Sequence, residues 1–176
     1  YVRISKYNNH TRKMERNIDP VKLLAFHQEI VTKHKNINGF YRFNLNEIEG
    51  QFRSGIETPA LLMMSQSNAL SSNTNKLANF NTHNMSILIL DFAGVPNDFD
   101  KENEVLNETY YLAMDVVSYL LQQNKNPNSF LHMLFDVDTV RIEKVGPIFD
   151  NMFGWNLLYD LKNHEPFCFE DDKWNL

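Results

Sequence analysis

The densest acidic group in the sequence that could share one site consists of three carboxylates, Asp136, Asp138 and Glu143. Asp136 and Asp138 are two residues apart, so in a strand both side chains lie on one face and can bind a divalent cation. The alternative is that two like charges lie on the solvent-exposed face of a strand. That alternative explains the same spacing, and we favour it.

Asp91 ends an apolar run, which is the position of the acidic catalytic group in many nucleases. Such a site also needs a Glu-x-Lys pair on the next strand, and the sequence lacks it there. The segment 91–100 lacks the alternating oxygen ligands and terminal glutamate of a calcium loop. The chain has six glycines and no glycine-rich phosphate loop, Gly-x-Ser-x-Gly elbow or Cys–His arrangement. We therefore expect a protein that is not an enzyme and uses no cofactor; a metal nuclease centred on Asp91, Asp136 and Asp138 is a third hypothesis.

His27 and His34 are seven residues apart and project from nearly the same side of a helix, two turns from each other. A zinc pair on a helix needs closer spacing and a third ligand, so we expect both at the surface or the rim of the core. The single cysteine, Cys168, excludes an internal disulfide and a cysteine-rich zinc site. We expect it to be a small buried residue between Phe167 and Phe169.

The composition is that of a globular protein. A chain of 176 residues is expected to form one domain with a sizeable core, and its 13 Phe fit such a core. A net charge of −5 argues against wholesale nucleic-acid binding, which needs a concentrated positive surface. No stretch approaches 18 apolar residues and no signal peptide opens the chain, so we expect no membrane association.

The segment 98–123 is the longest predicted helix, and the other elements are arranged around it. Asp98 or Asp100 can cap its start, and residues 124–127 end it at a proline. An apolar stripe recurs at helical spacing through Leu106, Tyr110, Ala113, Val117, Leu120 and Leu121. The opposite side is apolar as well, with Tyr111, Leu112, Met114, Val116 and Tyr119. Such a helix is expected to be covered on more than one side, by its own sheet or by a neighbouring subunit.

The first half of the chain predicts one helix and two strands before a long loop. Asp19-Pro20 predicts a helix start, and the helix runs to about Lys35 with Val21, Leu24 and Val31 facing inward and Phe26 and Ile30 as further candidates. Strands are predicted at 40–48, which alternates, and at 59–66, whose apolar run indicates burial on both faces. Residues 67–81 are rich in Ser and Asn without periodicity and are expected to be a long loop.

The second half predicts a strand at 84–92, two more at 129–136 and 137–144, a break at Gly146-Pro147, and a last strand from Gly154. We therefore expect a single α+β domain over 18–176, with a mostly antiparallel sheet of five or six strands covered by two helices.

The segment 1–17 is basic. It carries one acid, Glu15, and five cations: Arg3, Lys6, Arg12, Lys13 and Arg16. It is either a solvated N-terminal arm or an arm that reaches the acidic surface of a neighbouring subunit. Large aromatics dominate interfaces, so Tyr111, Tyr119, Trp155 and Trp174 are the predicted subunit contacts, together with Arg12 and Lys13. The alternative for each aromatic is core packing.

The C-terminal third consists of a helix of about twenty residues, a strand pair, a loop, an aromatic strand opening Phe153-Gly-Trp155, and a tail running Phe167-Cys-Phe-Glu-Asp-Asp-Lys-Trp174. In this element order and residue pattern it resembles the small α/β neck and tail-terminator proteins of tailed phages. The likeness covers 85–174 by element order and 145–174 by residue pattern. The chain is similar in particular to versions from phages of Bacteroidales, including the crAss-like group, which share its Asn, Lys and Tyr bias. The segment 67–81 is a departure from this pattern.

The resemblance implies a structural virion protein that forms a hexameric or dodecameric ring at the head–tail junction or tail end. Its partners would be further copies and neighbouring portal, neck or tail rings, with DNA passing through without sequence-specific binding. The protein would be made in the bacterial host cytoplasm. An acidic chain suits a ring through which DNA must slide without sticking, because both are negatively charged. The alternative is a non-catalytic binding or accessory domain.

Overall fold

The computed structural model describes residues 18–42, 55–64, 66–167, 169 and 171–175. This part of the chain contains two α-helices, six strands and a short 3-10 helix, as expected for an α+β fold. In chain order they are α1 (Pro20–Lys33), β1 (Gly39–Arg42), β2 (Ala60–Met63), β3 (Ser67–Ser72), β4 (Asn79–Phe92), α3 (Phe99–Lys125), β5 (Phe135–Ile148), β6 (Met152–His164) and η1 (Asp171–Lys173).

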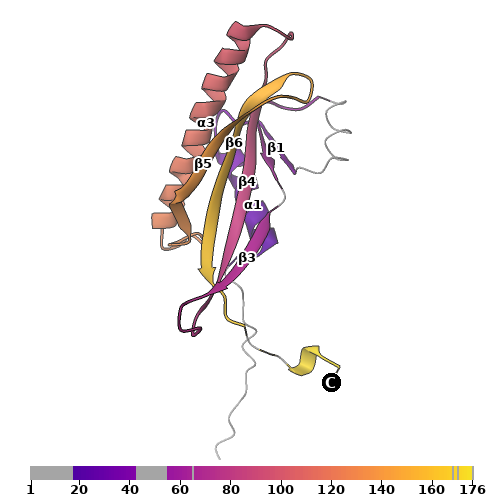
Figure 1. Ribbon diagram of the computed structural model, residues 1–176. Helices are drawn as coiled ribbons and strands as arrows, with labels where there is room; N and C mark the ends of the chain where they lie inside the picture. Colours follow the sequence, from indigo (N-terminus) through magenta and orange to yellow (C-terminus); the bar gives the residue numbers. More distant parts are fainter. Residues whose placement is uncertain (1–17, 43–54, 65, 168, 170, 176) are drawn as a thin grey trace, which may run out of the picture.

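The six strands form one open sheet built around β4 (Figure 1). The main strand order is β1-β2-β4-β6-β5, and β3 also pairs with β4. Both β2 and β3 lie along the same edge of β4, where β2 pairs with its second half and β3 with its first half. Only the β1–β2 pair is parallel among the described strands, so the prediction of a mostly antiparallel sheet is confirmed.

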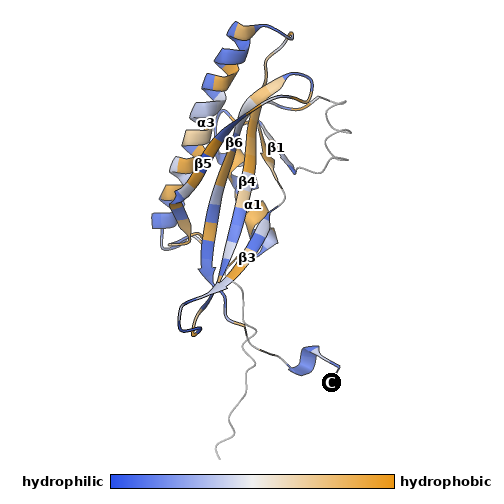
Figure 2. Ribbon diagram, viewed as in Figure 1, coloured by the Kyte–Doolittle hydropathy of each residue, from blue (hydrophilic) through white to orange (hydrophobic). Residues whose placement is uncertain are grey.

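Both helices cover the same face of the sheet. In Figure 1, α3 runs along β5 and β6, and α1 lies behind the middle of the sheet. Figure 2 shows the hydrophobic residues of β4 gathered in the half of the strand nearer β1. On the helix side, alternate residues of β4 and β6 supply the largest core cluster, among them Met85, Ile87, Ile89, Leu157, Tyr159 and Leu161. Burial of these side chains against the helices is the main stabilising term of the fold.

The opposite face of the sheet is apolar at one end and polar at the other. Leu62, Leu88 and Leu90 belong to a second, smaller core cluster at the apolar end. Towards the other end, cross-strand hydrogen bonds join Asn84 to Asp160 and Ser86 to Asn156, both at 2.8 Å. The prediction of a strand buried on both faces within 59–66 is confirmed for Ala60–Met63, all four of whose residues are buried, whereas Met64 and Gln66 lie outside the strand.

Helix α1 begins where the sequence predicted it. The Asp19 carboxylate accepts a hydrogen bond from the Lys22 backbone N–H at 2.8 Å, and Pro20 occupies the first turn. The cap satisfies one of the free N–H groups at the helix start.

Replacing Asp19 with alanine is expected to lower the free energy of unfolding by about 1 kcal/mol, because this N–H loses its acceptor. Asp19→Asn keeps an acceptor oxygen and is the matched control. The measurement is urea unfolding of both variants, and an equal loss in the two would contradict the role assigned to the cap.

The buried stripe of α1 only partly matches the expected one. Its buried residues are Leu23, Phe26, His27 and Ile30, so Phe26 and Ile30 face inward as expected. Leu24 and Val31 are half-buried against the core, whereas Val21 is 74% exposed. The expectation that His27 lies at the surface or rim was wrong, since its side chain is completely buried. His34 is at the rim as predicted, half-buried with Nε2 3.3 Å from Asp115 Oδ2.

Helix α3 also begins at an aspartate cap and ends where the sequence predicted. Asp98 caps it by accepting from the Lys101 N–H at 3.1 Å, and the helix ends at Lys125 before Pro127, as the sequence indicated. The predicted stripe was partly wrong. Ala113, Val117 and Leu120 are buried, but so are residues assigned to no stripe or to the opposite side: Val105, Thr109, Leu112 and Val116. The Thr109 hydroxyl donates to the Val105 carbonyl at 2.6 Å, which lets a polar residue lie in the core.

The long loop expected at 67–81 is not a loop along most of its length. Residues 67–72 are β3 and residues 79–81 begin β4, so only a six-residue connection remains. The Asn73 side-chain oxygen accepts from the Leu77 and Ala78 N–H groups and closes this connection. All six residues of β3 are exposed, so the strand is held by backbone hydrogen bonds to β4 and not by a buried face. Such a strand shows no alternation of apolar and polar residues, which is why the sequence did not predict it.

Two further strand predictions need correction. Residues 129–134 form turns rather than a strand, because Asn124 accepts from the Met133 N–H through its carbonyl and from the Phe135 N–H through its side chain. The predicted break at Gly146-Pro147 is a register shift between Val145 and Ile148, and β5 continues across it. An edge strand tolerates proline at such an irregularity.

Several predictions fall outside the described residues. They are the basic segment 1–17 with Arg12 and Lys13, the part of the predicted strand beyond Arg42, and Cys168.

Candidate functional site

The carboxylates that suggested a metal site are far apart. Asp91 pairs with Phe153 on β6, whereas Asp136 pairs with Asp160, seven residues further along the same strand. At about 3.4 Å per residue this is about 24 Å, too far for one cation to bind both. Glu143 is opposite Asn156, which places it about 14 Å along β6 from Asp136.

Asp136 and Asp138 are exposed, and the Asp136 side chain accepts from the Asp138 backbone N–H at 3.0 Å. Asp136 and Asp138 therefore lie close together because of a local hydrogen bond within β5. Within the described residues, no group of three or more His, Cys, Asp or Glu side chains has the arrangement of a metal site.

The double change Asp136→Asn and Asp138→Asn is expected to alter the free energy of unfolding by less than about 0.5 kcal/mol, because both side chains are exposed and asparagine keeps the acceptor oxygen. Thermal unfolding with and without Mg²⁺ or Mn²⁺ is the check. A metal-dependent rise in Tm that the double change abolishes would contradict this reading and restore the metal-site hypothesis.

His27 and Tyr159 form a buried polar pair between α1 and β6. The His27 Nδ1–H donates to the Leu23 carbonyl at 2.6 Å, so Nε2 accepts from the Tyr159 hydroxyl at 2.5 Å. Burial lowers the pKa of His27 to about 4, although the Leu23 carbonyl opposes this shift, and burial raises the pKa of Tyr159 above its ordinary value. Both groups are therefore neutral at pH 7, and each has its hydrogen-bond partner inside the fold. The pair joins a helix to the sheet and faces no solvent.

Tyr119, a predicted subunit contact, lies between α1 and α3 of its own chain. Its ring stacks on Phe26 with centroids 5.9 Å apart, and its hydroxyl donates to Glu29 at 3.1 Å. Lys33 donates to both Glu29 and the Tyr119 oxygen. The Lys33 hydrogen bond is the main cause of the lowered pKa of Glu29, and partial burial is the main cause of the raised pKa of Tyr119. Tyr119 thus packs the two helices together.

The outer face of α3 is the most aromatic exposed surface on the described helices. It consists of Tyr110, Tyr111 and Met114, which are 39%, 61% and 40% exposed. The Tyr110 ring contacts both Tyr111, with centroids 6.1 Å apart, and Trp155 at 5.4 Å. Trp155 is half-buried beneath, and its indole N–H donates to the Leu106 carbonyl at 2.8 Å. We call Tyr110, Tyr111 and Met114 the α3 outer face.

Trp174, the last predicted contact, lies in the segment that follows β6. Its ring stacks on Phe169 with centroids 5.6 Å apart and planes 21° apart, across the η1 turn. Both rings remain exposed, at 60% and 64%. Figure 1 shows this segment away from the sheet and both helices. We call residues 169 and 171–175 the tail turn.

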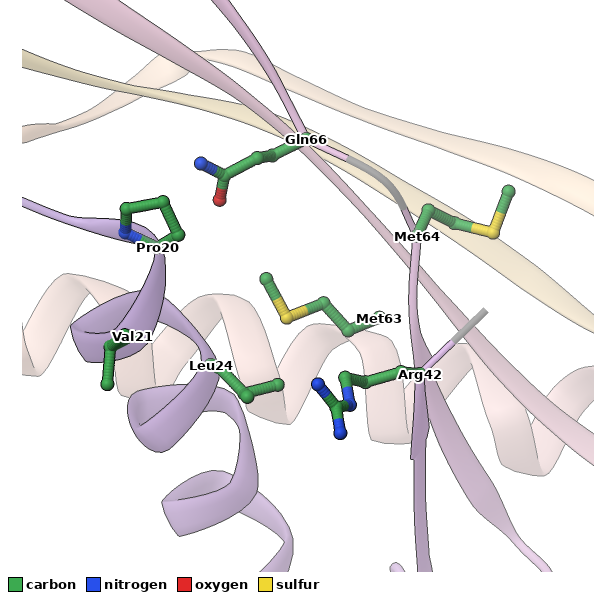
Figure 3. A pocket seen from close by; sticks show the side chains of 7 residues that line it. All are labelled: Pro20, Val21, Leu24, Arg42, Met63, Met64 and Gln66. Atoms are coloured by element: carbon green, nitrogen blue, oxygen red, sulfur yellow. The ribbon is translucent and has the colours of Figure 1, made fainter. Parts of the chain in front are cut away.

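A pocket lies between the first turn of α1 and the ends of β1 and β2 (Figure 3). Its volume is about 400 Å³, and its walls are mainly apolar: Pro20, Val21, Leu24 and Met63. Arg42 and Gln66 add a cation and an amide to the lining. In Figure 3 the Met63 side chain points toward Leu24, whereas Met64 points to the other side of β2. We call it the α1–β2 pocket. The pocket was not predicted, because its lining residues come from three segments that are far apart in the sequence and meet only in the fold.

No helix in the described part of the chain has both the length and the apolar character needed to span a membrane. Comparisons of the chain with protein-family models, with curated proteins and with solved structures found no match.

Proposed function

We propose that this protein is a structural subunit of a tailed-phage virion, which assembles side to side into a ring at the head–tail junction or tail end. The observation that carries the proposal is the α3 outer face. Two tyrosines and a methionine are exposed side by side on a helix whose other side already packs on the sheet. Tyrosine and methionine are enriched in protein interfaces, and large exposed apolar patches mark interaction sites.

A ring also needs two different, complementary surfaces on each copy, because its contacts are heterologous. The α3 outer face lies at the β5–β6 side of the sheet, whereas β1 forms the edge at the opposite side. Surfaces at opposite edges of one sheet let each copy contact one neighbour on either side. Under this proposal the chain acts through assembly, with hexamers or dodecamers and neighbouring virion rings as partners.

Tyr111→Glu tests the proposal, since it places a charge in the centre of the α3 outer face. The expected result is at least a tenfold weaker association, in the range of a truncated interface hot spot, measured by sedimentation velocity across a concentration series. Gln122→Glu is the matched control, because Gln122 is exposed on the same helix three turns away.

If Tyr111→Glu and the wild type associate equally well, the α3 outer face is not the subunit contact. If both stay monomeric at every concentration, the alternative of a non-catalytic binding or accessory domain replaces the ring.

A further inference from the structure

The tail turn and the α1–β2 pocket are complementary in polarity and charge. The tail turn presents two stacked aromatic rings and the carboxylates of Asp171 and Asp172, all exposed. The pocket offers apolar walls with the exposed Arg42 among its lining residues. Aromatic rings fit apolar pockets of a few hundred cubic ångströms, and Arg pairs readily with carboxylates.

Gln66 adds a specific polar contact. Its side-chain oxygen is buried and has no hydrogen-bond partner among the described residues. A buried acceptor without a partner costs free energy, so a donor that reaches it stabilises the complex. The Trp174 indole N–H is a donor on the exposed tail turn.

In its own chain, the tail turn lies away from the sheet and both helices (Figure 1). The chain leaves the sheet at Glu165, whose N–H bonds the Asn79 carbonyl at one end of β4. The pocket residue Met63 is opposite Ile87, eight residues further along β4, or about 27 Å away at about 3.4 Å per residue. Three residues lie between Glu165 and Phe169, and the four extended steps that join them span about 14 Å. Phe169 therefore falls short of the Met63 side of its own pocket, whereas the tail turn of another copy can approach the pocket without this restriction.

We propose that the tail turn of one copy docks into the α1–β2 pocket of a neighbouring copy. Trp174 and Phe169 fill the apolar space, the Trp174 indole donates to Gln66, and Asp171 or Asp172 pairs with Arg42. The contact is heterologous, so it repeats from copy to copy. It rests on the proposed ring function and names a contact that would hold neighbouring subunits together.

Two variants of the full chain test this docking. Trp174→Ala and Arg42→Glu should each weaken self-association at least tenfold, because one removes the aromatic anchor and the other reverses the charge that faces the tail turn. Arg141→Glu is the matched control, since Arg141 is also exposed and on an edge strand, at the opposite side of the sheet. All three substituted residues are exposed, so thermal unfolding should be unchanged.

Mixing the two weakened variants gives the sharper result. The Arg42→Glu chain keeps an intact tail turn and the Trp174→Ala chain keeps an intact pocket. Docking between chains therefore predicts that the mixture forms one-to-one pairs and stops there, at concentrations where the tenfold weaker association leaves each variant alone as a monomer. Native mass spectrometry of the mixture, with one chain isotope-labelled, distinguishes mixed pairs from pairs of one variant.

The outcomes separate this inference from the ring. A wild-type ring that neither variant weakens overturns the docking and leaves the ring standing. If the wild type forms open polymers rather than closed rings, and both variants weaken this association, the result supports the docking and overturns the ring. A wild-type monomer overturns both. If Arg42→Glu shifts Trp174 fluorescence without changing the mass, the tail turn occupies its own pocket and the docking between copies is wrong.

Discussion

Gly154→Ala is expected to lower the free energy of unfolding by at least about 3 kcal/mol, the upper range for overpacking a well-packed interior. A Cβ at this position would lie 1.9 Å from the Ile89 carbonyl oxygen and 3.1 Å from the Leu90 Cα. Both atoms belong to the backbone of β4, the strand that pairs with β6 here, so no side-chain rotation relieves the contact. Relief requires β4 and β6 to separate at the centre of the sheet.

Urea unfolding of the variant measures this loss, and Gly94→Ala is the matched control. Gly94 has a φ of 76°, but a Cβ there meets nothing within 4 Å. Its substitution should cost only the left-handed backbone penalty of about 1 to 2 kcal/mol. A smaller loss at Gly154 than at Gly94 would show that the two strands are not as close as described.

Lowering the pH from 7 to 5 is expected to remove about 2 kcal/mol of stability through His27 alone. The pKa of His27 is about 4 in the fold and about 6.5 in the unfolded chain, so below pH 6.5 the unfolded chain binds the proton more readily. The stabilisation is complete above pH 6.5, falls as the pH drops towards 4, and changes no further below that. The cause is the burial of the imidazole between Leu23 and Tyr159.

The test compares urea unfolding of the wild type and His27→Gln at pH 7 and pH 5. Glutamine can accept from the Tyr159 hydroxyl but does not titrate, so its loss over this range should be smaller by about 2 kcal/mol. The imidazole proton shifts of the wild type, followed by NMR, give the His27 pKa directly. Equal losses in the two proteins, or a His27 pKa near 6.5, would contradict the buried neutral pair.

The sequence predicted element types well where caps and apolar runs were strong. Asp19 and Asp98 cap helices as expected, and the run through Ile87 and Leu90 is a buried strand. Two of the errors on the helices share one cause. His27 was expected at the surface or rim and Thr109 was assigned to no stripe, yet each donates to a carbonyl one turn earlier and fits inside an apolar stripe.

The candidate surfaces were harder to predict because they depend on tertiary placement. Tyr111 and Trp174 are exposed, but Tyr119 packs α1 against α3 and Trp155 is half-buried against α3. Periodicity assigns a residue to a face of its helix but does not say which neighbouring element covers that face. The carboxylates illustrate the same limit, since Asp91 and Asp136 can be assigned to one site only until the strand register is known.

The solution mass of the purified full chain, measured by light scattering with a negative-stain image of the same peak, tests the central claim most directly. Side-to-side assembly through the α3 outer face predicts a closed ring of about six or about twelve copies, as heterologous contacts that close on themselves produce. A single species with the mass of one chain, unchanged up to the highest soluble concentration, would contradict the claim.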